Sequence, residues 1–228
     1  MAFGARTYEQ SSRAVTTHRV LRNTYMLLGL SMIPTVIGAF IGLSMDFGFM
    51  AEHPIMGTIA MIAVMFGLLW AVQANRDSGL GVVLLLAFTG VMGVFLGPIL
   101  QMAMGLSNGG EIVGLAAGGT GLIFFVLAGI ASTSKRDFSF LGKFLMVGLI
   151  LLIVASLANL FFQIPALHLA LSGVAVLLFS GFLLFDISRI VNGGETNYVM
   201  ATLSVYLSIY NIFVNLLQLL MAFMGERD

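Results

Sequence analysis

The sequence has 228 residues, of which 59% are hydrophobic and 9% are charged, and its formal net charge is zero. Soluble domains carry about 25% charged residues. A chain with so few charges cannot cover a water-exposed surface, so we expect an integral membrane protein. The balanced charge gives no reason to expect a nucleic-acid partner. The absence of cysteine excludes disulfides, thiol catalysis and thiolate metal sites.

Seven apolar segments follow one another, each close to the 20 or so residues that cross a bilayer. Before them lies a polar tail over residues 1–23, which has no apolar core and therefore does not resemble a cleavable signal peptide. The predicted spans are 24–44, 55–74, 80–104, 112–132, 140–161, 167–190 and 198–224. Connections this short predict one all-α bundle of seven transmembrane helices over residues 24–224, without a separate soluble domain.

The basic residues predict the orientation of the bundle. With the N-terminus in the cytoplasm, nine of the ten lysines and arginines fall in cytoplasmic segments, and only Arg227 falls on the other face. Cytoplasmic loops of membrane proteins carry such an excess. Because Arg227 is the exception, the last segment is also compatible with a helix that re-enters the membrane without crossing it.

Small residues mark the third and fourth spans as closely packed. In the third span, Gly90, Gly93 and Gly97 allow neighbouring helices to approach, and Pro98 predicts a kink. The fourth span contains the run "GLAAGGTG", which also favours tight helix contacts.

The sixth span carries a carboxylate, Asp186, near its cytoplasmic end. One interpretation is an interfacial group paired with Arg189 one turn further on. The other is a buried acid, which in a membrane bundle is a functional hypothesis by default. Burial favours the protonated acid and a nearby guanidinium favours the carboxylate, so such a group could change charge near physiological pH and act as a gate. Arg76, in the turn after the second span, lies at a similar depth and is a second candidate partner.

The seventh span places its polar side chains in steps of four and three residues. At about 100° per residue they fall within a sector of roughly 80°, so they form one stripe that must face the bundle interior. The stripe serves either as hydrogen-bonding contacts between helices or as one wall of a polar cavity. Its members are Ser204, Ser208, Asn211, Asn215 and Gln218.

The sequence gives no support for an enzyme. It contains no H-E-x-x-H, G-x-S-x-G or G-x-x-x-x-G-K-[ST] motif. The two lysines, Lys135 and Lys143, lie outside the late spans where a retinal Schiff base would be needed. We expect a non-enzymatic protein without a cofactor.

Three motifs together resemble the Bax inhibitor-1 family, and most closely its YccA-like bacterial branch. They are "GVFLGPIL", "KRDFSFLGKFL" and "LLFDISRIVNGGETNYVMATLSVYLSIYNIFVNLL". The resemblance implies six helices around a central seventh. It also implies a pH-sensitive calcium leak in some members, in which an aspartate ending the sixth span pairs with a second aspartate in the seventh, and an arginine after the second span locks the pair.

The proposed sensor is incomplete in this chain. Asp186 matches the first aspartate, but Ser208 stands in place of the second, and Arg76 lies one residue beyond the position of the family arginine, which is Asn75 here. One carboxylate and a hydroxyl share a proton, or hold a divalent cation, less well than two carboxylates do. Calcium is therefore expected at most as a permeant or weakly bound ion at Asp186.

The YccA-like branch implies a different activity in the bacterial cytoplasmic membrane. Its members are associated with the membrane-anchored AAA protease FtsH and modulate the degradation of other membrane proteins. Two hypotheses remain. The first is a modulator of membrane-protein quality control that binds this protease complex, with its polar tail as a handle. The second is a pH-sensitive cation leak that uses Asp186 and the polar face of the seventh helix.

Overall fold

Helices make up almost all of the described chain. The computed structural model describes residues 2–48, 52–134 and 137–226, and no strand occurs within those ranges. The helices are α1 (Ala2–Ser44), α3 (Pro54–Ala74), α4 (Gly79–Phe95), α5 (Gly97–Met104), α6 (Gly109–Thr133), α7 (Leu141–Phe162), α8 (Pro165–Val191) and α9 (Tyr198–Met224). An all-helical structure is what lipid demands, because a helix satisfies its backbone hydrogen bonds within one segment.

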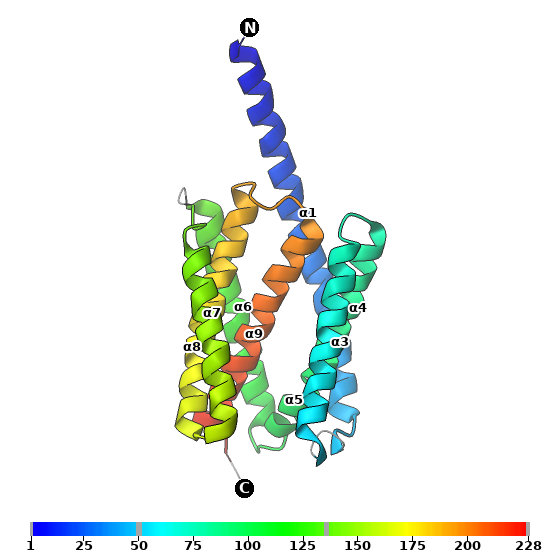
Figure 1. The fold of residues 1–228 in the computed structure, drawn as a ribbon, viewed down its shortest axis with the longest axis vertical. Coiled ribbons are helices and arrows are strands. Elements are labelled where there is room, and N and C mark those ends of the chain that lie inside the picture. Colours follow the sequence, from blue (N-terminus) through cyan, green and yellow to red (C-terminus); the bar gives the residue numbers. More distant parts are fainter. Residues whose placement is uncertain (1, 49–51, 135–136, 227–228) are drawn as a thin grey trace.

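Seven helical segments are long and apolar enough to cross a membrane, as the hydropathy pattern predicts. For six of them the ends agree with the predicted spans within three residues. The first differs, because α1 begins at Ala2 and its apolar portion begins at Thr17. Residues 2–23 therefore continue the first transmembrane helix. In Figure 1 this extension (dark blue) projects well beyond the bundle.

The third span is interrupted where the proline predicts. The helix stops at Phe95 and resumes at Gly97, with Pro98 at the second position of α5, where its missing N–H is not needed. Close packing of the glycines in this span is also confirmed. A Cβ at Gly93 would collide with the carbonyl oxygen of Thr35 on α1, and one at Gly97 would lie 2.7 Å from the Gly42 oxygen.

The glycine-rich run of the fourth span packs less tightly than we expected. Gly119 lies against Leu216 of α9, but nothing lies within 4 Å of a Cβ built at Gly114, Gly118 or Gly121. The expectation of tight contacts in this run is therefore confirmed at Gly119 and wrong at the other three glycines. The reason is geometric: α6 packs on α5, α8 and α9, and these three glycines lie outside those contacts.

The last helix, α9, is the centre of the bundle. It packs against α1, α4, α5, α6 and α8, and Tyr206, Ile212 and Leu217 on it are fully or almost fully buried. The hydroxyl of Tyr206 lies 2.9 Å from that of Thr35, which ties α9 to α1. Figure 1 shows α9 (orange to red) running from one end of the bundle to the other. It therefore extends through the bundle and does not turn back within it.

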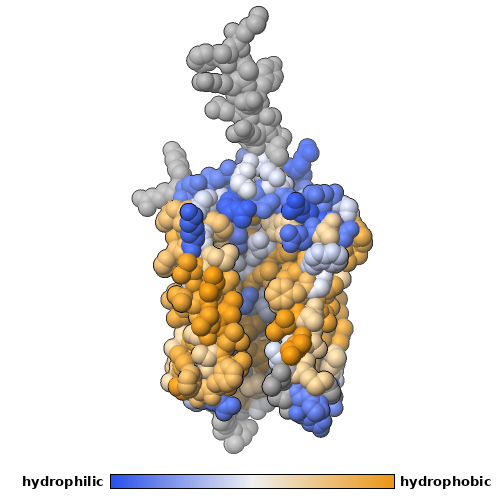
Figure 2. Space-filling model, in the orientation of Figure 1, coloured by the Kyte–Doolittle hydropathy of each residue, from blue (hydrophilic) through white to orange (hydrophobic). Residues whose placement is uncertain are grey.

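The two ends of the bundle differ in what they carry. At one end, which we call the N-terminal end, α1 projects outward beside the α3–α4, α6–α7 and α8–α9 turns, and α9 ends at the opposite end (Figure 1). Figure 2 shows a hydrophobic band around the middle with hydrophilic rims above and below. Such a band is the surface that a lipid bilayer covers.

Candidate functional site: a carboxylate and a polar cavity

Asp186 is half-buried near the N-terminal end of the bundle, on the face of α8 that meets α9. The neighbouring Leu183, Ile187 and Ile190 are at most 1% exposed and hold this face of α8 in the core. The Asp186 carboxyl lies near the Ser208 hydroxyl of α9 and interacts by charge with Arg189 and Glu195. The structure thus brings Asp186 and Ser208 together across the α8–α9 interface.

Arg189 pairs with a different acid. Its Nη2 lies 3.4 Å from Oε2 of Glu195, and its guanidinium carbon lies 5.5 Å from the centre of the Phe185 ring. Within the described ranges, no ion pair shorter than 4.0 Å joins Arg189 to Asp186. The arginine therefore acts on Asp186 through space, while its direct contact is with the α8–α9 turn.

Arg76 lies in the α3–α4 turn and is not brought to Asp186. Its Nε lies 3.6 Å from Oδ2 of Asp77, and both side chains are at least half exposed. The Arg76 carbonyl oxygen accepts a hydrogen bond from Nδ2 of Asn197 in the α8–α9 turn. The backbone of Arg76 therefore lies near the start of α9, and its side chain pairs with Asp77.

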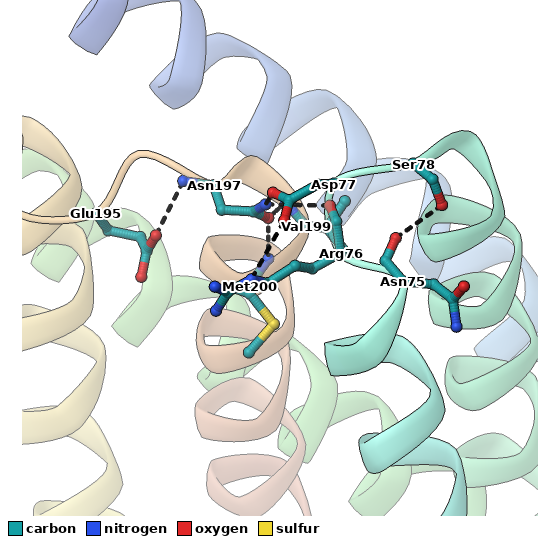
Figure 3. A network of polar contacts seen from close by, with 8 residues as sticks. All are labelled: Asn75, Arg76, Asp77, Ser78, Glu195, Asn197, Val199 and Met200. Carbon is teal, nitrogen blue, oxygen red and sulfur yellow. Dashed lines mark hydrogen bonds and ion pairs between the residues drawn. The ribbon is translucent and has the colours of Figure 1, made fainter.

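Asn197 connects these turns, as Figure 3 shows. Its Oδ1 accepts hydrogen bonds from the N–H groups of Val199 and Met200, which caps the start of α9. Its Nδ2 donates to Oδ1 of Asp77 at 2.7 Å, and its own N–H donates to Oε1 of Glu195 at 2.9 Å. A chain of contacts thus runs from Arg189 through Glu195 and Asn197 to the α3–α4 turn. The sequence signal was present, because asparagine before a helical pattern is a typical cap, but its partners come from a distant turn.

The polar stripe of α9 divides into two parts. Ser208 faces Asp186, and Ser204, one turn nearer the N-terminal end, is half-buried. Asn211, Asn215 and Gln218 line a cavity of about 430 Å³ between α7, α8 and α9. The other polar side chains of its lining are Ser156, Asn159, His168 and Ser172.

Hydrogen bonds show which polar groups in the cavity are already used. Ser172 Oγ donates to Oε1 of Gln218 at 2.8 Å and joins α8 to α9. Asn211 and Asn215 each donate from Nδ2 to a carbonyl one turn earlier on α9. Within the described residues, no hydrogen bond reaches the Oδ1 of either asparagine. In this stripe, Gln218 therefore makes an interhelical hydrogen bond, and Asn211 and Asn215 form part of the cavity wall.

The sequence alone did not reveal the side of the cavity opposite α9. Ser156 and Asn159 are three residues apart on α7, a spacing that puts them on one face, but two polar residues in a long apolar helix are a weak signal. His168 and Ser172 are four residues apart on α8 and share a face for the same reason. Only the packing of α7 on α8, and of α8 on α9, shows that these pairs face the same space.

The site offers neutral hydrogen-bonding groups more than it offers metal ligands. Within the described residues, no group of three or more His, Cys, Asp or Glu side chains is placed to hold a metal ion. A calcium contact at Asp186 therefore stays a prediction. The cavity wall combines amides, hydroxyls and one imidazole with leucine and isoleucine, and it contains no Asp, Glu, Lys or Arg.

The central position of α9 among the other helices is what the motifs of the sequence imply. The family model described as "Inhibitor of apoptosis-promoting Bax1" matches residues 17–225. The chain belongs to the Bax inhibitor-1 family. The assignment made from the motifs is thus confirmed, and the match begins at the same residue as the apolar part of α1.

Bacterial members of the Bax inhibitor-1 family are similar over almost the whole chain. The protein of Escherichia coli K12 named modulator of FtsH protease YccA is 41% identical over 206 residues, which cover 90% of this chain and 91% of that protein. An uncharacterised membrane protein of Vibrio cholerae is 41% identical over 216 residues, 95% of this chain and 94% of its own length. An uncharacterised protein of Pseudomonas aeruginosa is 42% identical over 200 residues, with 88% and 87% covered. The family and these relatives support a multi-pass protein of the bacterial inner membrane.

Proposed function

We propose that this protein modulates membrane-protein quality control by binding a membrane-anchored AAA protease of the FtsH type. The observation that carries the proposal is the 41% identity, across nine-tenths of both chains, to a protein named modulator of FtsH protease. Within the described residues, the turns between the helices are short and none of them holds a soluble domain. Its contribution is binding, because the sequence contains none of the catalytic motifs considered above.

The projecting part of α1 is the proposed contact with the protease. Residues 2–16 precede the apolar portion of α1, and at 1.5 Å per residue they extend about 22 Å beyond it. The excess of basic residues at the N-terminal end of the bundle favours the cytoplasm for this extension. The AAA domain of such a protease lies on that side, so the extension is within its reach.

Co-purification tests this proposal directly. The full chain, a variant lacking residues 2–16, and Asp186→Asn are expressed in bacteria with a tagged FtsH-type protease, and the membranes are dissolved in mild detergent. The full chain and Asp186→Asn should be recovered with the protease, and the shortened chain should lose most of that recovery. Equal recovery of all three would contradict the role of α1, and recovery of none would contradict the proposed function.

A second candidate function is a proton-sensitive cation leak, favoured by one specific observation. Asp186 and Ser208 meet within the polar stripe of α9, and the three members that follow Ser208 line a cavity between α7, α8 and α9. Asn211, the first of these, is one turn from Ser208, so polar groups extend almost continuously along α9. An interior acid beside such a stripe is the arrangement in which membrane proteins move ions or protons.

Flux into proteoliposomes separates the two candidates. Calcium and proton flux is measured across neutral pH for the wild type, Asp186→Asn and Ser208→Asp. A leak should give flux that depends on pH, disappears in Asp186→Asn and increases in Ser208→Asp, since a second carboxylate strengthens cation binding. Flux no greater than in empty liposomes for the wild type and for Ser208→Asp would exclude the leak.

A further inference from the structure

The polar cavity reaches the middle of the membrane, well below the depth of lipid headgroups. Asn211 is the central residue of α9, with equal lengths of helix on either side. Gln218 lies seven residues, or about 10 Å, nearer the opposite end of the bundle. His168 and Asn159 also lie near that end, in the second turn of α8 and the last turn of α7. The cavity, which we call the wedge, therefore has a polar wall and extends from the membrane interface opposite the N-terminal end to the bilayer centre.

The wedge is accessible from the lipid between α7 and α9. Because α7 packs principally on α8, and α8 packs on α9, no helix among the described residues closes the third side. Ile153, Leu157 and Leu160 of α7 form its rim and are 49–69% exposed. In Figure 2 a recess runs between the two halves of the bundle, and hydrophilic surface is seen inside it at mid-height.

The wall has hydrogen-bonding groups to spare. The Oδ1 atoms of Asn211 and Asn215 accept no hydrogen bond within the described residues, and Gln218 uses its Oε1 with Ser172 while its Nε2 donates to no described group. Unpaired polar groups at this depth cost free energy unless something satisfies them. A volume of about 430 Å³ lies within the range of natural binding sites, about 300–1,000 Å³.

We propose that this wedge binds a transmembrane segment of another membrane protein through an uncharged polar side chain near the centre of that segment. The proposal rests on the proposed role in quality control, and it names the partner class. A transmembrane helix that has not assembled with its partners leaves such side chains exposed to lipid. The unused Oδ1 atoms of Asn211 and Asn215 accept hydrogen bonds from that side chain, and the leucine and isoleucine rim packs against the apolar residues on either side of it.

The chemistry of the wall favours this occupant over a phospholipid headgroup. Phosphate groups are bound by arginine, lysine or clustered backbone N–H groups, and the lining contains no charged side chain. The unused acceptors also lie at the bilayer centre, where a lipid presents only hydrocarbon. A helix that carries asparagine, glutamine, serine or threonine presents a neutral donor at that depth.

The natural absence of cysteine makes the proposal testable by site-specific cross-linking. Ile153→Cys places one thiol on the rim of the wedge. Leu122→Cys places one on α6, also near the centre of its helix and 66% exposed but outside the cavity lining, and serves as the matched control. Each full-length variant is reconstituted in phosphatidylethanolamine and phosphatidylglycerol vesicles with a polyleucine transmembrane peptide that carries one central cysteine beside either asparagine or leucine. Disulfide formation under mild oxidation is then quantified on gels.

The asparagine peptide should cross-link to Ile153→Cys at least about threefold more than the leucine peptide, as one interhelical hydrogen bond in a membrane would give. At Leu122→Cys the two peptides should be equal. Adding Asn215→Leu to Ile153→Cys should remove the preference, and the circular dichroism spectrum checks that this variant is folded. Asn211→Leu provides a second test if the first variant does not fold.

Two results would overturn the proposal: equal cross-linking of both peptides at Ile153→Cys, or a preference that persists after Asn215→Leu. So would rapid labelling of Ile153→Cys by a membrane-impermeant thiol reagent that the asparagine peptide does not slow, because the wedge would then be a water-filled space. No protease is present in this assay. Its result is therefore independent of the co-purification experiment, and failure of one proposal is distinguished from failure of the other.

Discussion

The contact between α1 and the α4–α5 segment gives the sharpest quantitative prediction. Gly42 is buried there, and a Cβ added to it would lie 2.5 Å from the Val94 carbonyl oxygen and 3.0 Å from the Gly97 Cα. Carbon–oxygen contacts are normally no closer than about 3.3 Å. In Gly42→Ala the two backbones must therefore separate by about 0.8 Å, which is the difference between the normal carbon–oxygen contact of about 3.3 Å and the 2.5 Å to the Val94 oxygen.

Separation of the helices should outweigh the better helix propensity of alanine. Forcing an extra carbon into a packed core costs about 1–3 kcal/mol, whereas replacing a helical glycine by alanine contributes at most about 1 kcal/mol. We expect Gly42→Ala to lower the free energy of unfolding by about 1–2 kcal/mol. Gly67→Ala is the matched control, because nothing lies within 4 Å of a Cβ at Gly67 on α3.

Unfolding by sodium dodecyl sulfate in mixed micelles, followed by the helical signal in circular dichroism, measures both variants. The midpoint should fall for Gly42→Ala and stay level or rise for Gly67→Ala. If the two alanine variants unfold at the same midpoint, the close approach of α1 and α4 does not limit stability and the reasoning is refuted.

Other predictions concern polar contacts. Asn197→Ala should lower the free energy of unfolding by about 1 kcal/mol or more, because it removes a helix cap and the link to the α3–α4 turn; an unchanged detergent midpoint would contradict this. Ser172→Ala and Gln218→Leu, combined in a double-mutant cycle, should give a coupling of about 0.6–1.7 kcal/mol, and zero coupling would mean that their hydrogen bond contributes nothing. In the α6–α7 turn, hydrogen bonds from the Ser139 hydroxyl and N–H lower the pKa of Asp137. Ser139→Ala should raise that pKa in a carboxyl NMR titration. The stabilisation is present above the ordinary aspartate pKa and is lost as pH falls through the lowered value, and an identical titration in the variant would count against the contact.

The spans and the central stripe could be predicted because each depends on a local pattern. Hydropathy determines which segments lie in lipid, whatever their neighbours are. The spacing from Ser208 to Gln218 determines a helical face by itself, and the motif containing Asp186 indicated the family. These features follow from one helix at a time.

The features that escaped prediction depend on which helices become neighbours. Ser156 of α7 and Ser172 of α8 belong to the cavity only because of how their helices pack around α9. The partner of Arg76 depends on the conformation of a turn, where Asp77 is simply nearer than Asp186. The helical extension of α1 was not predicted because residues 2–16 lack the periodic apolar residues by which a helix is identified.

The central position of α9 has a consequence for how the protein is made. The helix around which the others pack follows all of them in the chain, so the earlier spans reach the membrane before their shared core exists. Residues 198–228 need about 2–6 s of translation, and for that time the polar faces meant for α9 are exposed to lipid. A chain that stops short of α9 is therefore left without the centre of its own structure.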